Sequence, residues 1–574
     1  MVNQEIAKIF YRIADYLEMD EVAFKPYAYR KAAIGLESTE EDVEEIYKRG
    51  GIEALKEITG VGEGLAKAIE EYLKTGKIKH YEQFKKRLPL NLEELISVEG
   101  VGPKKVKVLY QKLGIRDLKT LEKAAKAHKI APLFGFGQKT EKNILEGIAF
   151  VKRSKGRFLL GDILLKAKEV LEKLQNLREV EQADIAGSAR RRKETIGDVD
   201  FLAISNYPSK VIDFFVKLPG IVKIWGKGTT KASVRMKDGF DMDIRVVPER
   251  SYGSALQYFT GSKEHNIATR RIAMDKGLKL SEYGLFKGNK MIGGQTEEEI
   301  YKMLGLLWID PELRENQGEI EAALSGKLPK IIGHHDIKGD LHTHSDWDGG
   351  DDSIEEMAKA AMVLGYEYIG IADHTKALHI EHGLDEKQLE KRNKEIDDLN
   401  SKFKIQNSKF RILKGCEANI LKDGSIDIKD EFLAKLDYVI AGIHSSMKID
   451  KNRMTERMIR AMQNPNVDII SHPTGRILKQ RDEYQIDFDK VLRAAKETGT
   501  ILEINAWPER LDLNDQNIRK AKKVGVKMII NTDSHRKDQL RLMEFGVAQA
   551  RRGWAEKGDI ANCWPLEKML KYLK

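Results

Sequence analysis

Histidines and acidic residues recur at regular places in the C-terminal part of the chain, and they are the side chains best suited to do chemistry. Six of the 13 histidines and one glutamate lie in six short segments, Gly339–His344, Ala372–His374, Gly415–Asn419, Gly442–His444, Ser471–Pro473 and Thr532–His535. Nearly every segment follows a short apolar, β-branched run, and helical patterns separate them. This predicts strand-then-helix units with a polar residue at the C-terminal end of nearly every strand, where α/β barrels assemble active sites.

Imidazole and carboxylate groups together form the ligand set that proteins use for Zn²⁺, Mn²⁺ or Fe²⁺. His342 and His344 are two residues apart, so both rings project from the same side of a strand end, and Asp533 and His535 repeat this spacing. A single histidine at a strand end is usually structural. Six at equivalent places of a repeating architecture favour a metal centre.

A second set of carboxylates lies near the middle of the chain. Asp198 and Asp200 project from one face of a predicted strand, and Asp243 supplies a third carboxylate from another strand. Just upstream, Gly187-Ser188 ends a strand and opens a turn whose N–H groups can hold phosphates. Solvated Asp pairs are common, but the neighbouring residues Phe201–Ile204 are apolar. Partly buried carboxylates need cations, and two Mg²⁺ ions would suit phosphoryl transfer.

Two Gly-apolar-Gly turns near the N-terminus each connect two predicted helices. They are Gly60-Val61-Gly62 and Gly100-Val101-Gly102, and Lys104 follows the second; Phe134–Lys139 is a weaker third copy. Glycine permits tight turns, and the next helix offers free N–H groups to an anion. One such turn is usually an ordinary helix connection, but the repeat resembles the helix-hairpin-helix motif, which holds DNA phosphates without reading sequence.

The length of 574 residues predicts three to five domains. There is no run of 18 apolar residues and no signal-peptide pattern, so we expect a soluble, cytoplasmic protein without membrane contact. Two cysteines fit a reducing compartment. A net charge of +9 with 33% charged residues is compatible with nucleic-acid binding but does not establish it.

The histidine segments resemble the PHP (polymerase and histidinol phosphatase) domain, a distorted (β/α)₇ barrel that holds two or three metal ions. The resemblance implies these ligands: His342, His344, His374, Glu417, His444, His472, Asp533 and His535. One departure is that Gly349 stands where the family has an aspartate. Asp348, one residue earlier, reaches the metal only if the loop adjusts.

The rest of the chain resembles family X DNA polymerases. Residues 24–33 are similar to the start of their 8-kDa domain, in which Lys25 and Tyr29 would hold the 5′-phosphate at a gap. Residues 184–204 are similar to their palm and residues 258–270 to their thumb. The resemblance implies catalytic, metal-binding carboxylates at Asp198, Asp200 and Asp243, with Asp243 accepting the proton of the primer 3′-hydroxyl.

The same resemblance implies nucleotide contacts from Gly187, Ser188, Arg191, Gly197, Tyr258, Phe259, Gly261 and Asn266. It implies DNA contacts from Lys25, Tyr29, Gly60, Gly62, Gly100, Gly102, Lys104, Arg245 and Arg270. The lysine that forms a Schiff base in enzymes of the polymerase beta type is replaced by Ala68, and Lys67 is one residue away. We therefore expect little or no 5′-deoxyribose-phosphate lyase activity.

The expected fold is multidomain, with all-α hairpin domains, an α+β nucleotidyltransferase palm and thumb, and a C-terminal PHP barrel. The expected boundaries are 1–80 (8-kDa-like domain), 81–150 (fingers), 151–256 (palm), 257–318 (thumb), 319–335 (polar linker) and 336–574 (PHP). The expected function is gap-filling DNA polymerisation in base excision repair, with metal-dependent 3′-5′ exonuclease or phosphoesterase activity in the PHP domain. AP endonuclease and 3′-phosphatase activities remain open.

We expect Mg²⁺ or Mn²⁺ at the palm, and two or three Mn²⁺, Zn²⁺ or Fe²⁺ ions at the PHP site. Gapped or nicked DNA and dNTPs are the expected partners of a monomer. Two alternatives stay open. A template-independent nucleotidyltransferase acting on RNA would share the three aspartates, but not the paired hairpins or residues 258–270. A non-catalytic DNA-end scaffold would need broken carboxylates, and all three are present.

Overall fold

The computed structural model describes residues 2–39, 41–96, 98, 101–153, 156–405 and 409–573, which form two compact units. The first unit comprises residues 1–155 together with 479–481, and the second comprises 156–478 and 482–574. None of the described helices is long and apolar enough to span a membrane.

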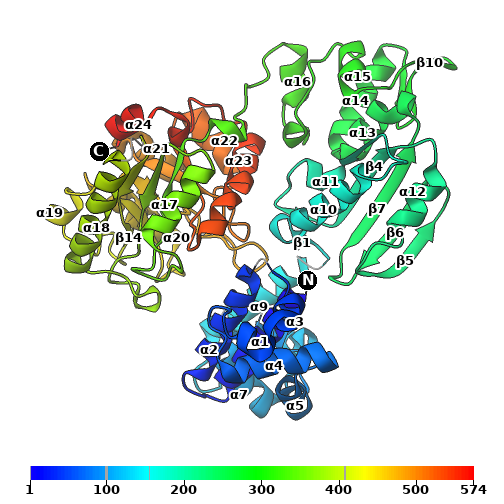
Figure 1. Ribbon diagram of the computed structural model, residues 1–574. Helices are drawn as coiled ribbons and strands as arrows, with labels where there is room; N and C mark the ends of the chain where they lie inside the picture. Colours follow the sequence, from blue (N-terminus) through cyan, green and yellow to red (C-terminus); the bar gives the residue numbers. More distant parts are fainter. Residues whose placement is uncertain are drawn as a thin grey trace. The chain divides into compact units, whose positions relative to one another are not determined.

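The first unit is built from helices, blue to cyan in Figure 1. They are α1 (Val2–Met19), α2 (Lys25–Ser38), α3 (Val43–Leu55), α4 (Glu63–Thr75), α5 (Lys79–Arg87), α6 (Leu92–Ile96), α7 (Pro103–Leu113), α8 (Leu118–Lys126) and α9 (Gln138–Arg153). The amphipathic helices bury one shared apolar core that includes Phe10, Leu55, Ile69 and Leu109. The expected all-α character of this region is confirmed.

The second unit begins with a five-stranded mixed sheet, in the order β2-β4-β7-β6-β5. The strands are β2 (Gln182–Ile185), β4 (Asp198–Ile204), β7 (Asp241–Val247), β6 (Lys231–Met236) and β5 (Ile221–Lys227). Helices α10 (Leu160–Gln175) and α12 (Pro208–Phe215) pack their apolar residues on one face of the sheet. The antiparallel pair β1 (Phe158–Leu159) and β3 (Thr195–Ile196) lies beside it, and α11 (Gly187–Arg190) follows β2.

The predicted thumb follows the palm sheet. Helices α13 (Tyr252–Thr260), α14 (Lys263–Asp275) and α15 (Glu297–Met303) accompany a three-stranded antiparallel sheet of β8 (Lys279–Ser281), β9 (Gly284–Lys287) and β10 (Lys290–Gly293). The stretch predicted as a polar linker is folded here. Its helix α16 (Glu319–Leu324) places Ile320 and Ala323 in the same apolar core as Tyr301, because hydrophobic residues interrupt the polar ones.

The C-terminal region is a closed barrel of parallel strands with helices outside it (Figure 1). The strands are β11 (Gly339–Thr343), β12 (Tyr368–Ile371), β13 (Arg411–Lys414), β14 (Glu417–Asn419), β15 (Ile440–Gly442), β16 (Ile469–Ile470), β17 (Ile501–Asn505) and β18 (Met528–Asn531). β13 and β14 are successive parts of one strand path, so the ring has seven strand positions. The bridges Thr343–Ser534 and His374–Glu417 link the two sheets and close the ring, as expected for a (β/α)₇ barrel.

The barrel helices are α17 (Ile354–Val363), α18 (Glu386–Ile405), α19 (Asp430–Leu433), α20 (Lys451–Met462), α21 (Phe488–Thr498), α22 (Asp515–Val524), α23 (Met543–Arg552) and α24 (Leu566–Tyr572). Every one of these strands except β13 is buried along its whole length, since parallel strands are covered on both faces. Leu511 and Phe545 of the barrel region join the apolar core of the palm, so barrel and palm share buried surface within the second unit.

Candidate functional site

The three palm aspartates lie on two neighbouring parallel strands. In the register of β4 and β7, Asp198 pairs with Asp241 and Asp200 pairs with Asp243. All four side chains therefore project from one face of the sheet. Asp241 is held by Arg235 and by the indole N–H of Trp225 at 2.9 Å. In the part of the chain that the structure describes, the other three carboxylates on this face, Asp198, Asp200 and Asp243, have no such close ion pair with an arginine or lysine.

The turn after β2 approaches this face closely. Gly187 has a φ of 64°, and a Cβ there would lie 2.2 Å from a carboxylate oxygen of Asp200. Only glycine fits this position. Burial, together with the charges of Asp198 and Asp243, raises the pKa of Asp200 to about 7, and burial also raises the pKa of Asp198. In the described part of the chain these carboxylates do not form a tight three-ligand cluster. Their carboxylate oxygens are ligands that suit divalent cations.

This raised pKa predicts a pH-dependent stability difference. The folded pKa of Asp200, about 7, exceeds its ordinary value of 3.8, so the stability that its neutral form contributes is lost as pH rises through about 7. In chelator, Asp200→Asn should therefore unfold at a temperature about 3 °C above the wild type at pH 8 and at an equal temperature near pH 4. Thermal unfolding at both pH values measures this. An equal melting temperature at pH 8 would contradict it.

The predicted nucleotide residues of palm and thumb are brought together by two arginines. Arg190 donates to Thr260 Oγ1 at 2.7 Å and pairs with the buried Glu297 at 2.8 Å. Arg191 donates to the carbonyl of Thr260 and, at 3.1 Å, to Glu315. Ser188 is partly exposed beside them in α11, and Gly197 directly precedes Asp198. The turn Gly187–Arg191 thus meets the end of α13, where the thumb begins.

Tyr258, Phe259, Gly261 and Asn266 lie around this meeting point. The Asn266 amide donates to the carbonyl of Tyr258 at 2.7 Å, and the ring of Phe259 stacks with the guanidinium of Arg245, 4.8 Å away. Arg270 donates to the Asn266 carbonyl at 3.1 Å. Asn266 is 7% exposed, so a contact with a base pair would require its amide to leave these partners.

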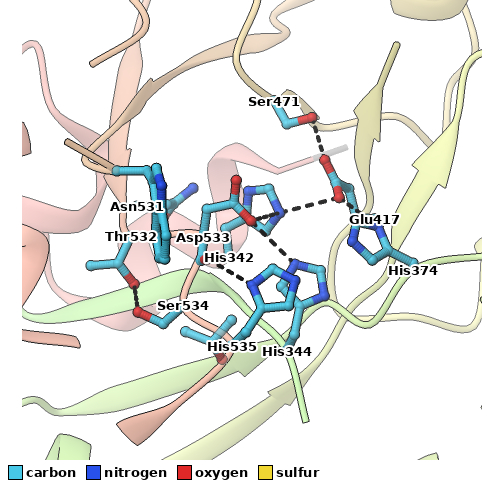
Figure 2. A network of polar contacts seen from close by, with 12 residues as sticks. His342, His344, His374, Glu417, Ser471, Asn531, Thr532, Asp533, Ser534 and His535 are labelled. Carbon is cyan, nitrogen blue, oxygen red and sulfur yellow. Dashed lines mark hydrogen bonds and ion pairs between the residues drawn. The ribbon is translucent and has the colours of Figure 1, made fainter. Parts of the chain in front are cut away.

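The second candidate site lies at the C-terminal ends of the barrel strands, where Figure 2 shows histidines converging on Glu417 and Asp533. Glu417 is surrounded by four imidazole nitrogens, those of His374 at 2.8 Å, His472 at 3.1 Å, His444 at 3.2 Å and His342 at 3.4 Å. Asp533 lies 3.5 Å from His344 and 3.6 Å from His342. His535 stacks on His344 with the ring centres 4.1 Å apart.

These residues are suited to bind metal because their buried ligand atoms lack hydrogen-bond partners. Such atoms occur on His342, His344, His374, His444, His472 and Glu417. Three clusters of potential ligand atoms, each within 4.8 Å, are His344–His374–His535, His342–His344–Asp533 and His374–Glu417–His444. Burial, reinforced by His344, lowers the pKa of His535 to about 4, which keeps this imidazole neutral and able to bind a cation.

Asp348 reaches this centre, whereas Gly349 does not replace it. The side chain of Asp348 is buried, lies 2.8 Å from His344 Nδ1 and accepts the backbone N–H of His374 at 2.7 Å. A Cβ at Gly349 would instead meet Glu381, 2.6 Å away. Asp348 also forms a cluster with His344 and Asp373. The loop therefore places the Asp348 side chain next to the histidines. Whether Asp348 is a metal ligand or only the partner of His344 stays a prediction.

Several buried partners of the histidines escaped the sequence reasoning. Glu503 accepts from His342 Nδ1 at 2.7 Å and from the backbone of His472 at 2.8 Å. Asn531 donates to Glu503 at 3.0 Å, and Ser471 donates to Glu417 at 2.7 Å. Such outer residues orient ligands. Of these residues, only Glu503 could have been noticed in the sequence, because it is a charged residue in the middle of an apolar strand.

The hairpins of the first unit keep the geometry that the glycines predict. Gly60 has a φ of 78° between α3 and α4, and a Cβ there would meet Lys31 at 2.7 Å. Gly62 and Gly102 are the residues just before α4 and α7, and Lys104 lies in the first turn of α7. Gly100 lies outside the described residues. The backbone N–H groups at both helix starts are thus available to an anion.

Lys25 begins α2 beside the exposed Phe24, and the hydroxyl of Tyr29, further along α2, lies 3.4 Å from His80. Lys67, the candidate closest to a lyase lysine, forms an ion pair with Glu63 at 2.6 Å and is 59% exposed. Hydrogen bonding to Glu63 raises the pKa of Lys67. A Schiff-base lysine needs a lowered pKa, so this environment is unfavourable for that chemistry.

We therefore expect no covalent adduct of the beta type. Incubation with a 5′-deoxyribose-phosphate substrate and borohydride should trap less than about 1% of the protein, because Lys67 is charged and Ala68 cannot react. Mass spectrometry of the product measures this. An adduct mapped to Lys67 would refute the prediction, and Lys67→Ala is the variant that identifies the attachment site.

Four regions of the chain match models of known protein families. Family models match residues 1–78 (helix-hairpin-helix domain), 92–149 (SAM-like helix-hairpin-helix tandem), 255–315 (DNA polymerase beta thumb) and 340–506 (PHP domain). The chain is 38% identical over 579 residues to the DNA polymerase/3′-5′ exonuclease PolX of Bacillus subtilis (strain 168), covering 100% of both chains.

Other relatives match part of the chain. Over 209 residues, or 34% of this chain, the sequence is 32% identical to a probable phosphatase of Acetivibrio thermocellus, covering 78% of that protein. A probable phosphatase of Thermoanaerobacter sp. (strain X514) is 34% identical over 211 residues, which is again 34% of this chain and 78% of the relative.

Proposed function

The chain belongs to the family X DNA polymerases of the PolX type with a C-terminal PHP domain, and we propose that it fills short gaps in DNA during repair and trims 3′ ends with its barrel. The observation that supports polymerisation best is the register of β4 and β7, which sets Asp200 beside Asp243 below the turn at Gly187. A nucleotide triphosphate held at this turn would present its α-phosphate to the carboxylates.

Each of the palm residues has its own proposed role in nucleotide addition. Asp198, Asp200 and Asp243 would hold Mg²⁺ or Mn²⁺, which neutralises their charges and stabilises both the attacking and the leaving oxygen when bound. Asp243 accepts the proton of the primer 3′-hydroxyl, and Ser188 and Arg191 hold the β- and γ-phosphates. Arg191 would have to exchange Glu315 for the triphosphate. Tyr258 and Phe259 line the sugar, Asn266 faces the base and Arg270 contacts the template strand.

DNA binding is assigned to the first unit and to basic residues near the palm. The turns at Gly60 and Gly62 and at Gly100 and Gly102, with Lys104, would hold backbone phosphates without reading sequence. Lys25 and Tyr29 would contact the 5′-phosphate at the gap, and Arg245 lies two residues beyond Asp243 on β7. A gapped duplex with a 5′-phosphate is therefore the proposed substrate of a monomeric enzyme.

The barrel site supports phosphodiester hydrolysis. His342, His344, His374, Glu417, His444, His472, Asp533, His535 and, within reach, Asp348 would hold two or three Mn²⁺, Zn²⁺ or Fe²⁺ ions, which lower the pKa of bound water and polarise the phosphate when present. Arg510 lies 3.7 Å from Asp533 and adds a positive charge at the rim of this site. Removal of single nucleotides from a 3′ end is the proposed main reaction. The similarity of about a third of the chain to probable phosphatases supports a 3′-phosphatase activity as the second candidate.

One set of labelled substrates tests both activities. On a gapped duplex with dNTPs and Mg²⁺, we expect primer extension by one or a few nucleotides, and without dNTPs, with Mn²⁺, we expect shortening from the 3′ end. A primer ending in 3′-phosphate and a duplex with an abasic site distinguish the 3′-phosphatase and AP endonuclease activities. No extension of any gapped primer would refute the polymerase proposal and leave the nucleotidyltransferase and scaffold alternatives. Incorporation on RNA without template would favour the former.

A further inference from the structure

An arginine of the barrel forms hydrogen bonds to the proposed nucleotide-binding turn of the palm. Arg552, the last residue of α23, donates from one guanidinium nitrogen to the backbone carbonyl of Arg191 at 2.9 Å and to Glu315 at 3.1 Å. Its other terminal nitrogen donates to Asp515. The side chain is 2% exposed, so its charge is buried and all three acceptors compensate it.

The carboxylate of Glu315 connects this arginine to the expected triphosphate ligand. The same Glu315 oxygen that accepts from Arg552 also accepts from Arg191 Nε at 3.1 Å. Arg552 therefore holds the backbone of Arg191 directly, and it also holds Glu315, the residue that Arg191 must release to bind a triphosphate. The position of the Arg191 guanidinium depends on a residue more than 350 positions later in the sequence.

A second barrel arginine, Arg476, forms an ion pair with Glu194 of the same palm segment. Arg476 lies on the loop after β16, four residues beyond His472, and pairs with Glu194 at 2.6 Å. It also donates to the carbonyl of Leu511, and its side chain is 8% exposed. Glu194 directly precedes β3, which leads into β4 and Asp198. Residues 191 and 194 of this palm segment are thus both held by buried cations of the barrel.

A more exposed palm–barrel contact lacks this feature. Lys168 of α10 and Glu544 of α23 form an ion pair at 2.7 Å, but Lys168 is 43% exposed and does not touch the turn. A contact that merely joins two domains needs no buried, multiply bonded arginine on a substrate-binding turn. Such precision is useful where geometry controls nucleotide binding.

We infer that Arg552 and Arg476 are positioning residues of the polymerase site, so that the PHP barrel completes the nucleotide-binding turn of the palm. The inference rests on the proposed polymerase function. It gives the barrel a role in nucleotide addition that is independent of its own metal centre, since neither arginine is among the expected metal ligands.

Steady-state gap filling with the full chain tests this. Arg552→Lys keeps the charge but cannot reach three acceptors. We expect it to raise the KM for dNTP about tenfold with a kcat within about threefold of the wild type, because the turn that binds the triphosphate loses its alignment. Lys168→Met, the matched control across the same interface, should leave the KM unchanged. Mn²⁺-dependent nuclease activity should remain in both variants and show that the barrel is folded.

A double-mutant cycle provides a second test, in which one of the two partners, Glu194, is partly exposed. Glu194→Gln, on the palm side and 31% exposed, and Arg476→Gln remove the same ion pair from opposite sides. Each should raise the KM for dNTP several-fold, and the double variant should be no worse than either single variant. An unchanged KM in folded Arg552→Lys and Glu194→Gln, or an equal rise in Lys168→Met, would overturn the inference. A wild-type enzyme that incorporates nothing would overturn the proposed function instead.

Discussion

Replacing Asp243 with alanine will reduce nucleotide incorporation about 10³-fold or more while gapped DNA still binds. Asp243 lies directly beside Asp200 in the parallel register of β7 and β4, and Ser233 donates a hydrogen bond to it. It is the proposed acceptor of the primer proton and a proposed metal ligand, so one substitution removes both functions. Single-nucleotide incorporation and a separate DNA-binding titration measure the two effects.

Asp241 offers a matched control two residues away on the same strand and the same face. Its carboxylate is already paired with Arg235 at 2.8 Å and with Trp225 at 2.9 Å. Asp241→Asn should therefore change incorporation by less than about threefold, within the small effect usual for exposed ion pairs. Equal losses in the two variants would show that negative charge on this face, rather than Asp243 itself, is what the reaction needs. Normal incorporation by Asp243→Ala would refute the palm assignment.

Short-range patterns were enough to single out the acidic residues and histidines that the structure brings together at the two sites, and their roles stay predictions. The period of two in Asp198–Asp200 and in His342–His344 describes how side chains leave a strand, and this depends only on local geometry. The order of the domains and the (β/α)₇ class followed from apolar runs separated by helical patterns and from family resemblance. The thumb and PHP family matches and the closed ring of strands confirm them.

What the sequence did not predict are contacts between residues far apart in the chain. Asp241 is paired because β5 and β6 bring Trp225 and Arg235 onto its face, which no local pattern around Asp241 reveals. The stretch after Gly318 looked like a polar linker, yet Glu319 is fully buried and binds His265 at 2.8 Å. Buried polar residues are read as exposed from sequence, because their partners lie in other elements. Arg552 and Glu315 are hidden for the same reason.

Replacing His344 with alanine will abolish 3′-end degradation and leave polymerisation intact. His344 is fully buried and belongs to three of the four clusters of potential ligand atoms. We expect Mn²⁺-dependent nuclease activity to fall by more than about 100-fold, which exceeds the usual loss when a residue that only orients a metal ligand is removed. We also expect less bound metal per chain. His472→Ala should have the same effect on degradation, but its loop continues to Arg476, which makes His344 the cleaner variant for testing polymerisation.

The exposed His379 of the same barrel is the matched control, and His379→Ala should retain both activities and the metal. Elemental analysis of wild type and variants separates two explanations for any loss. If His344 holds a metal, activity and metal content fall together, and added Mn²⁺ restores part of both. If it instead positions substrate, the metal content stays and only activity falls. Undiminished degradation by His344→Ala, with wild-type metal content, would show that the nuclease reaction does not use this barrel centre, whatever its resemblance to other PHP domains.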